Sequence, residues 1–222
     1  MAQIFLVFVG TAFLATGCGD SIPETIKITE RRDKHYLLNH LTAKNIMGYK
    51  KELQRRGIQR IQLPEHTTDS QLQQYNDAGL LTNVTSLNLY GCNKLTNLSG
   101  LSDLTNLTSL DLRWCDNLTD ISALSGLTGL TSLSLSGCGK LTDISALSGL
   151  TGLTSLNLSF CEKLTDISGL SGLTGLRSLD LFGCNKLTDL SGLSGLTGLT
   201  SLDLGCGEKL DDSLKATSGN SF

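Results

Sequence analysis

The chain has 222 residues, of which 39% are hydrophobic and 18% charged, so it can bury a core and does not have the composition of a disordered protein. Its net charge of −3 is too small to indicate binding to nucleic acid or to a membrane surface. The charge is unevenly divided, because residues 20–80 hold ten Lys/Arg and eight Asp/Glu, whereas residues 81–222 hold eight and thirteen. The mildly acidic second part argues against contact with a phosphate backbone, so we expect no nucleic-acid partner.

The chain opens with an uncharged apolar run over residues 4–17. A membrane-spanning helix needs about 20 apolar residues, so this run is too short and is typical of an export signal over residues 1–17. Its end, Leu14-Ala15-Thr16-Gly17-Cys18, resembles the lipobox of bacterial lipoproteins, whose cysteine becomes the lipidated first residue. The resemblance implies an exported cell-envelope protein that contacts the membrane only through a lipid on Cys18. An ordinary signal peptide cleaved nearby is the alternative.

Gly19 stands where an aspartate often marks inner-membrane retention in such lipoproteins. The resemblance therefore favours an outer-membrane lipoprotein.

Residues 18–57 are interpreted as a linker and an N-terminal helical cap. Apolar residues recur at helical spacing from Leu37 to Arg56, and Asn39 or Thr42 is suited to cap the start of the helix. Gly57 stands where helices often end. A basic helix here would cover the open end of a repeat core, because terminal repeats need a polar outer face.

The alternating run from Ile58 to Leu63 predicts a strand. Its Ile61-x-Leu63 lies 26 residues before Leu87-x-Leu89, which belongs to the periodic part of the chain. We therefore interpret residues 58–80 as a degenerate first repeat, in which residues 69–77 supply one or two helical turns.

Six copies of a 23-residue unit fill residues 81–214, followed by a polar tail over residues 215–222. One unit runs from Leu150 to Gly172. The same leucine opens each copy: Leu81, Leu104, Leu127, Leu150, Leu173 and Leu196. Self-similarity at a fixed period of this length indicates a solenoid, in which each unit folds only by stacking on its neighbours.

The unit reads LxxLxLxxC followed by LTDIS and resembles the leucine-rich repeat family, closest to the bacterial internalin-like type with cysteine in place of asparagine. The resemblance implies an α/β solenoid with one short parallel strand per repeat on the concave face and turns or 3-10 segments on the convex face. It also implies binding through the exposed concave positions, to a protein, a peptide or a glycan. Because the tail is short, the last repeat is expected to be poorly capped, which makes an end-to-end self-assembling structural protein the alternative.

Two turn positions in each unit are occupied only by Gly, Asn or Asp, which tolerate left-handed backbone. We predict positive φ, or at least a tight turn, at both. The first comprises Asn83, Asn106, Gly129, Gly152, Gly175 and Gly198, and the second Asp103, Gly126, Gly149, Gly172 and Gly195. The aspartate of each LTDIS is placed to cap a short turn on the convex side, and Asn97 can do the same in the first copy.

Five of the seven cysteines are 23 residues apart and form one inward row: Cys92, Cys115, Cys138, Cys161 and Cys184. Side chains stacked in parallel have poor geometry for a disulfide, so we predict a row of buried thiols. Cys206 is displaced by one position in the last copy. His35, His40 and His66 have no metal-ligand spacing and are expected at the surface, and we predict no metal or cofactor.

Positions that vary between copies are not required by the fold and are candidates for function. Bulky residues replace the Ser or Gly of other copies at several exposed strand-face positions, and an acidic row lies beside them. Aromatic and arginine side chains are favoured binding anchors. The predicted ligand-binding residues are Tyr90, Asp111, Arg113, Trp114, Phe160, Asp180, Phe182 and Asp203. No nucleophile–base pair, phosphate loop or metal motif is recognisable, so we expect no enzyme.

Overall fold

The computed structural model describes residues 27–31 and 35–205. The predicted export signal over residues 1–17, the lipidation site Cys18, the last cysteine Cys206 and the polar tail over residues 215–222 lie outside the described residues.

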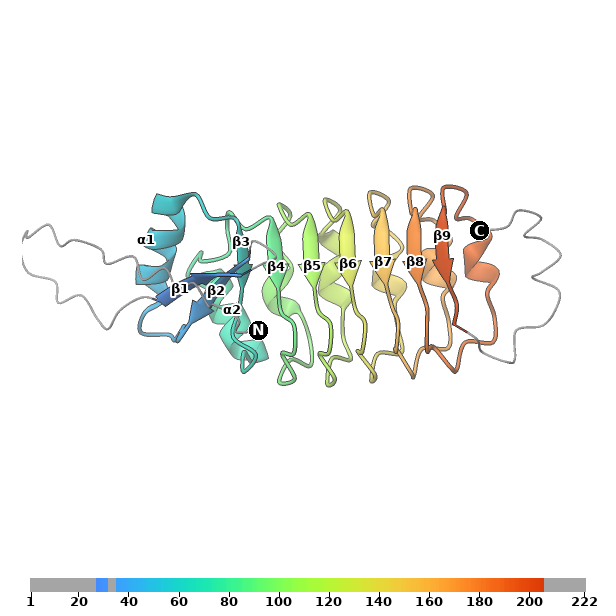
Figure 1. Cartoon of the computed structure of the whole chain (residues 1–222), viewed down its shortest axis with the longest axis horizontal. Helices are drawn as coiled ribbons and strands as arrows, with labels where there is room; N and C mark the ends of the chain where they lie inside the picture. The colour runs from blue at the N-terminus through green and yellow to red at the C-terminus, as the bar shows by residue number, and fades with distance from the viewer. Residues whose placement is uncertain (1–26, 32–34, 206–222) are drawn as a thin grey trace, which may run out of the picture.

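A single sheet runs the length of the described chain (Figure 1), and each strand pairs with the strands next to it in sequence. Within the described residues the sheet has nine strands. β1 (Lys27–Glu30) and β2 (Tyr36–Asn39) pair antiparallel, and β2 then pairs in parallel with β3 (Arg60–Gln62). The repeat strands follow in parallel: β4 (Ser86–Asn88), β5 (Ser109–Asp111), β6 (Ser132–Ser134), β7 (Ser155–Asn157), β8 (Ser178–Asp180) and β9 (Ser201–Asp203).

The strands are aligned so that equivalent residues of successive copies face one another, as in the pairing of Leu110 with Leu133. β3, in the segment predicted to be a degenerate first repeat, keeps this register, because Ile61 pairs with Leu87. The prediction of an extra strand at this point is confirmed.

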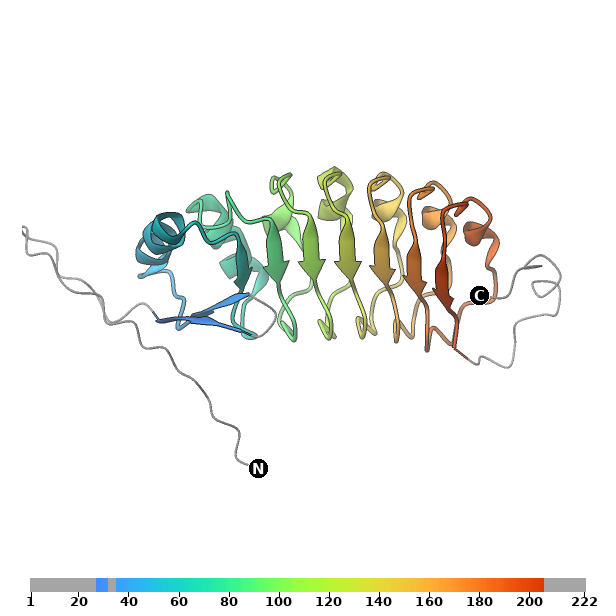
Figure 2. The ribbon, with the colours of Figure 1, turned by 45° about the horizontal axis from the view of Figure 1, so that its top comes forward.

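Short helices stack on the side opposite the strands (Figure 2). α2 (Asp69–Asp77) confirms the predicted helical turns of the first repeat, and a capping box between Thr68 and Gln71 fixes its start. Each later repeat has a 3-10 turn: η1 (Ser99–Leu101), η2 (Ser122–Gly126), η3 (Ser145–Leu147), η4 (Ser168–Leu170) and η5 (Ser191–Leu193). The predicted solenoid, with strands on one face and turns on the other, is therefore confirmed.

The core consists of aliphatic side chains that recur in every copy. In the copy that opens at Leu127, seven of them are at most 2% exposed: Leu127, Leu130, Leu133, Leu135, Leu141, Ile144 and Leu147. Burial of each contributes about 1.5–3 kcal/mol of gross stabilisation, which offsets the ordering of the backbone only when copies stack.

The N-terminal cap differs from the expected single helix. α1 spans Ile46–Arg56 and ends at Gly57 in the left-handed conformation, but its N-cap is Asn45, not Asn39 or Thr42. Leu37 and Leu38 belong to β2 instead, where Leu38 is fully buried, and Leu41 lies between β2 and α1. The apolar spacing fits a strand as well as a helix there, and pairing with β3 decides in favour of the strand.

His35 was expected at the surface and is buried. Its Nε2 lies 2.8 Å from the hydroxyl of Ser86, which joins the cap to the first full repeat. His40 and His66 are exposed as expected.

The predicted turn positions are tight, but their φ angles are not positive. At the first position the neighbouring repeat lies close: a Cβ on Gly129 would lie 3.0 Å from the carbonyl oxygen of Thr105, and one on Gly198 would lie 2.7 Å from that of Thr174. In the second copy Asn106 instead donates from Nδ2 to the carbonyl of Thr82. At the second position, Cβ atoms on Gly126, Gly149 and Gly172 would make ordinary contacts of 3.5–3.8 Å.

The aspartates of the LTDIS segments cap the 3-10 turns as predicted. Asp143 Oδ1 accepts the backbone N–H of Ser145 at 2.8 Å, Asp189 does the same for Ser191, and Asn97 for Ser99. These backbone hydrogen bonds lower the pKa of the Asp143 and Asp189 carboxyl groups.

The five inward cysteines are buried, free thiols, as predicted. Each donates to a backbone carbonyl of the preceding repeat, as Cys138 Sγ does to Leu112 at 3.3 Å and Cys184 Sγ to Leu158 at 3.1 Å. Burial raises the pKa of all five thiols, to about 12 for Cys115 and Cys161 and to about 11 for Cys184.

Candidate functional site

Among the repeat strands, β4, β5, β7, β8 and β9 each end in a turn held by the side chain of the last residue. In β6 the hydroxyl of the last residue, Ser134, is buried and has no hydrogen-bond partner among the described residues. Asp111 Oδ1 accepts the N–H of Arg113 at 3.0 Å, and Asp180 Oδ1 accepts that of Phe182 at 2.9 Å. Asn88, Asn157 and Asp203 make the equivalent bond to the residue two positions on. The acidic row was predicted as part of a ligand site. In the structure its carboxylates accept backbone hydrogen bonds that stabilise the turn after each of these strands.

The residue three positions after the last residue of the strand is left-handed in five successive copies, as glycine in some and as an aromatic residue in the others. Five equivalent residues have positive φ: Gly91 (70°), Trp114 (58°), Gly137 (78°), Phe160 (58°) and Gly183 (74°). Glycine adopts this conformation freely, whereas a bulky side chain there costs about 1–2 kcal/mol. Glycine and an aromatic residue therefore alternate along the solenoid, and the aromatic members are held in a strained backbone.

The alternation has a steric cause. A Cβ on Gly137 would lie 2.7 Å from Cε3 of Trp114, and a Cβ on Gly183 would lie 2.8 Å from Cδ1 of Phe160. Each ring therefore rests on the glycine of the following repeat. An aromatic residue at this position requires that the next copy has no side chain there.

Three rings meet to form a continuous apolar strip across the repeats. The centroids of Trp114 and Phe160 are 6.3 Å apart with the planes inclined by 23°, and Phe160 meets Phe182 edge to face at 5.2 Å. The three side chains are nevertheless 40–46% exposed. In the part of the chain that the structure describes, the exposed large apolar side chains are these three, Tyr90 and Met47.

Tyr90 and Arg113 extend the strip toward the N-terminus. The guanidinium of Arg113 lies 5.5 Å from the centroid of the Tyr90 ring, a cation–π contact. The same guanidinium forms a two-point ion pair with Asp111, with Nη2 to Oδ2 at 2.6 Å and Nε to Oδ1 at 2.9 Å. We call Tyr90, Arg113, Trp114, Phe160 and Phe182 together the aromatic ridge.

Small residues fill the rest of the row to which Tyr90, Arg113 and Phe182 belong. Ser136 and Ser159 are buried, and the hydroxyl of Ser159 donates to that of Ser136 at 2.8 Å. In the middle of the ridge the large side chains are therefore those of Trp114 and Phe160, and the hydroxyls of Ser136 and Ser159 are paired with each other.

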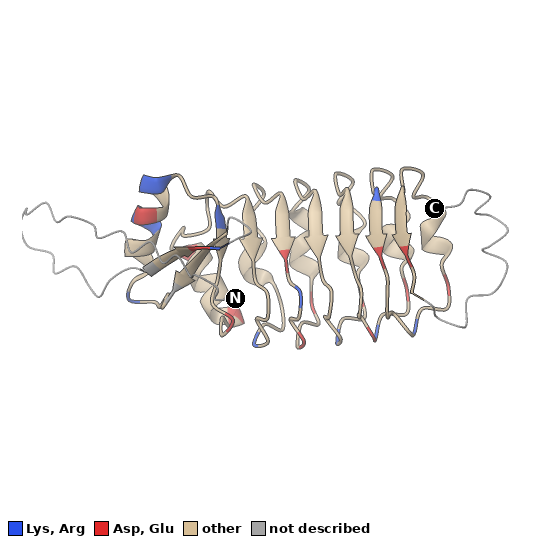
Figure 3. Ribbon diagram, viewed as in Figure 1, with Lys and Arg blue, Asp and Glu red and all other residues tan. Residues whose placement is uncertain are grey.

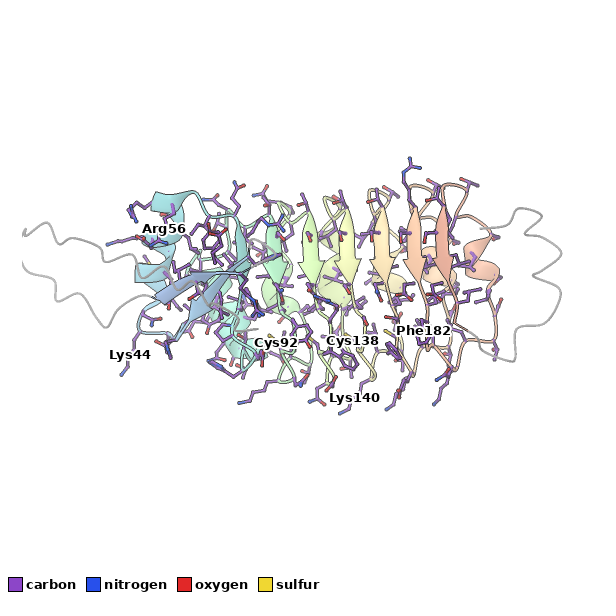
Figure 4. All side chains as sticks on the ribbon, in the orientation of Figure 1. Lys44, Arg56, Cys92, Cys138, Lys140 and Phe182 are labelled. Carbon is purple, nitrogen blue, oxygen red and sulfur yellow. The ribbon has the colours of Figure 1, made fainter. Side chains whose placement is uncertain are left out.

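Charged residues gather on the edge of the solenoid that carries the ridge, whereas the turns at the opposite edge carry few (Figure 3). Lys94, Lys140, Lys163 and Lys186 recur, all exposed, two residues after the inward cysteines. Figure 4 shows Lys140 at this edge and Phe182 near it. The ridge is thus an apolar centre with a charged rim, the usual composition of a protein interface.

The described residues offer little support for other chemistry. Within residues 27–31 and 35–205, no group of three or more His, Cys, Asp or Glu side chains could hold a metal ion. One hollow lies between α1 and the turns around Gly57 and Gly79, and another beside Asp120 and Asp143, and neither includes a ridge residue.

The structure brings together five of the eight predicted site residues in the ridge. Asp111 is tied to Arg113, and Asp180 and Asp203 hold strand-end turns. The sequence analysis did not predict that the rings of Trp114 and Phe160 need glycine at positions 137 and 183 of the next copy. The signal was available, because these glycines and Gly91 recur at 46-residue spacing.

The described residues thus form a repeat solenoid with an exposed aromatic ridge. Residues 105–149, 128–172 and 151–195 match the family described as "Leucine Rich repeats (2 copies)". Within the chain, similarity to leucine-rich repeats is therefore shown for residues 105–195, which are less than half of its length. No curated protein sequence matches it.

Several solved structures are similar to the chain. An internalin (inlF) from Listeria monocytogenes has 29% identity and a TM-score of 0.46, covering 71% of this chain and 54% of that one. Internalin C2 from the same species has 27% identity and a TM-score of 0.40, covering 64% and 66%. A leucine-rich repeat protein from Leptospira interrogans has 24% identity and a TM-score of 0.46, covering 70% and 45%. The chain thus spans from under half to about two thirds of their lengths.

Proposed function

We propose that the chain is a non-catalytic binding module that recognises a protein or peptide through the aromatic ridge. The observation that carries the proposal is that Trp114 and Phe160 combine a strained, left-handed backbone with exposed side chains. Left-handed aromatic residues are destabilising and are replaced by glycine in the alternate copies. A strained anchor that keeps 40–46% of its surface exposed contributes more to binding than to folding.

The composition of the ridge favours a protein partner. Trp, Tyr and Arg are the residues most enriched at binding hot spots, and the ridge has one of each beside two phenylalanines. The rings and the Arg113–Asp111 pair also fix one another in place, so little side-chain freedom is lost when a partner docks. Glycans also stack on aromatic faces and are the competing ligand class.

The test is affinity capture of a partner from a cell-envelope extract. It compares the wild type with a variant in which ridge residues are replaced by the residues found at equivalent positions of other copies. Trp114→Gly with Phe182→Ser places at both positions the residues found at Gly137 and Ser159, so the fold is expected to persist. We expect capture of the partner to fall at least about tenfold. The control is Arg177→Ala, which removes an exposed side chain that precedes β8 and lies outside the ridge.

Equal capture by the ridge variant and the wild type would contradict the proposal. Capture that survives protease treatment of the extract would reassign the ligand to a glycan.

We also propose that the chain acts in the bacterial cell envelope as an outer-membrane lipoprotein, anchored through Cys18. The support is the lipobox-like sequence before Cys18. In the described residues no helix is both long and apolar enough to cross a bilayer. Intact mass of the mature protein tests this, because a diacyl or triacyl adduct on Cys18 is expected and an unmodified N-terminus elsewhere would contradict it.

A second candidate function is self-assembly through the C-terminal end of the solenoid. Leu199, Leu202 and Leu204 near β9 are only partly buried, whereas the equivalent Leu133 and Leu135 are at most 1% exposed. Light scattering at rising concentration tests it: a mass that grows supports assembly, and a constant monomer mass contradicts it.

A further inference from the structure

α1 lies at the N-terminal end of the solenoid, and one of its faces is turned away from the protein (Figure 1). Ile46, Tyr49 and Leu53 are its buried residues and define the inward face. Met47, Lys51 and Arg55 are four residues apart and exposed, so they form one line along the opposite face. We call these three residues the α1 stripe.

The region around the α1 stripe is strongly basic although the whole chain is acidic. Residues 44–60 contain six Lys/Arg and one acidic residue, Glu52, whereas the whole chain has a net charge of −3. Glu52 forms ion pairs with Arg55 and Arg56, and its side chain is only 22% exposed, against 66% for Arg55. The surface that faces outward is therefore net positive (Figure 3).

Met47 adds an apolar element to this basic surface. It is 55% exposed, the highest value among the exposed large apolar side chains of the described residues. A long flexible thioether side chain between cations is suited to enter the boundary between lipid headgroups and acyl chains.

The position of α1 in the sequence places it near the proposed anchor. Nine residues lead from Cys18 to Lys27, where β1 begins. Such a segment spans at most about 30 Å when fully extended. β1 and α1 lie at the same end of the solenoid in both views of the ribbon (Figures 1 and 2).

We propose that the α1 stripe binds an anionic lipid surface, and that this contact orients the solenoid with its repeats pointing away from the membrane. Cations attract anionic headgroups, Met47 inserts at the boundary, and the acidic repeats are kept at a distance. This orienting role rests on the lipid anchor proposed at Cys18, whose two or three acyl chains hold the protein at the membrane but do not fix its orientation. The proposal does not depend on the ligand of the aromatic ridge.

The test is co-sedimentation of the full chain carrying Cys18→Ser, so that no lipid is attached, with phosphatidylglycerol-rich vesicles and with pure phosphatidylcholine vesicles. We expect binding to the anionic vesicles alone. Lys51→Gln with Arg55→Gln should weaken it roughly 30-fold, given about 1 kcal/mol for each cation near the surface. The matched control is Lys140→Gln with Lys163→Gln, which changes the charge equally on the repeats and should leave binding within about twofold.

Circular dichroism of both pairs verifies that the fold is retained. Absence of binding to anionic vesicles, or equal loss with both pairs, would overturn the proposal. A DNA duplex that binds the α1 stripe as tightly as the vesicles do would also overturn it, because the surface would then select phosphate polymers in general.

Discussion

The indole ring of Trp114 rests on Gly137, at the point where a Cβ would come within 2.7 Å of the ring. Both residues are left-handed and occupy equivalent positions in adjacent repeats. The ridge is therefore specified by pairs of repeats, because the glycine of one copy makes room for the anchor of the copy before it.

Gly137→Ala is expected to displace the Trp114 ring. Trp114 is the only tryptophan in the chain, so its emission maximum and near-ultraviolet circular dichroism report on this ring alone. We predict a change in both signals. Gly91→Ala is the matched control, because it carries the same left-handed strain but its Cβ would meet only Glu65 side-chain atoms, at 3.6 Å or more. Unchanged spectra in Gly137→Ala, or equal changes in both variants, would contradict the packing described.

The strain at Trp114 predicts an unusual order of stability. Trp114→Gly is expected to be more stable than Trp114→Ala by about 1 kcal/mol, because glycine adopts φ near +58° without the clash that a Cβ introduces. The comparison uses urea unfolding of the two variants, which lose the same ring contacts. A lower stability for the glycine variant would show that Trp114 is not left-handed in solution.

The buried thiols predict a loss of stability at alkaline pH. Their folded pKa values are raised, to about 11 for Cys184 and about 12 for Cys115, whereas unfolded thiols titrate near 8.5. Their contribution is thus complete below about pH 8 and falls as pH rises toward the folded pKa values. Five such thiols give a slope of roughly 7 kcal/mol per pH unit above the unfolded pKa.

Urea midpoints measured between about pH 8 and 9.5 check this slope. Cys138→Ala removes one of the five thiols and should reduce the slope of unfolding free energy against pH by about one fifth. Stability that stays constant over this range would mean that the thiols are not buried in the protonated form.

The LTDIS caps predict a difference between two substitutions at one position. Asp143→Asn should be nearly neutral, because Asn97 makes the same bond in the first copy, whereas Asp143→Ala should cost about 1 kcal/mol. The free energy of unfolding in urea checks both. Because the cap lowers the pKa of Asp143, its contribution is present above the unfolded pKa near 4 and is lost as pH falls further. Equal effects of the two substitutions would argue against a side-chain cap.

The repeated part of the fold is predictable because six copies report the same pattern. The register of Leu110 with Leu133, the capping role of Asp143 and the free thiol of Cys138 all follow from a single stacked unit. The cap is not repeated, so the ambiguous spacing around Leu38 gave a helix where tertiary pairing forms β2.

The residues of the aromatic ridge can be predicted from the sequence, but their backbone conformation and packing cannot. Tyr90, Trp114 and Phe182 stand out because other copies have small residues at their positions. The left-handed backbone of Trp114 could not be predicted from the sequence. Gly91 and Gly183 indicate a positive φ at the equivalent positions, but a tryptophan does not. The left-handed backbone at Trp114 costs free energy of folding, and the residue preferences used to interpret a sequence favour low-energy backbone, so they do not predict such a strained residue.

The most direct test of the central claim is the emission of Trp114 during titration with the captured partner. If the ridge is the binding surface, the indole, which is 46% exposed in the free chain, becomes buried and its emission shifts to shorter wavelength in proportion to complex formed. The shift should saturate at the stoichiometry of binding. Saturable binding with an unchanged Trp114 emission spectrum would place the partner elsewhere on the solenoid and contradict the account.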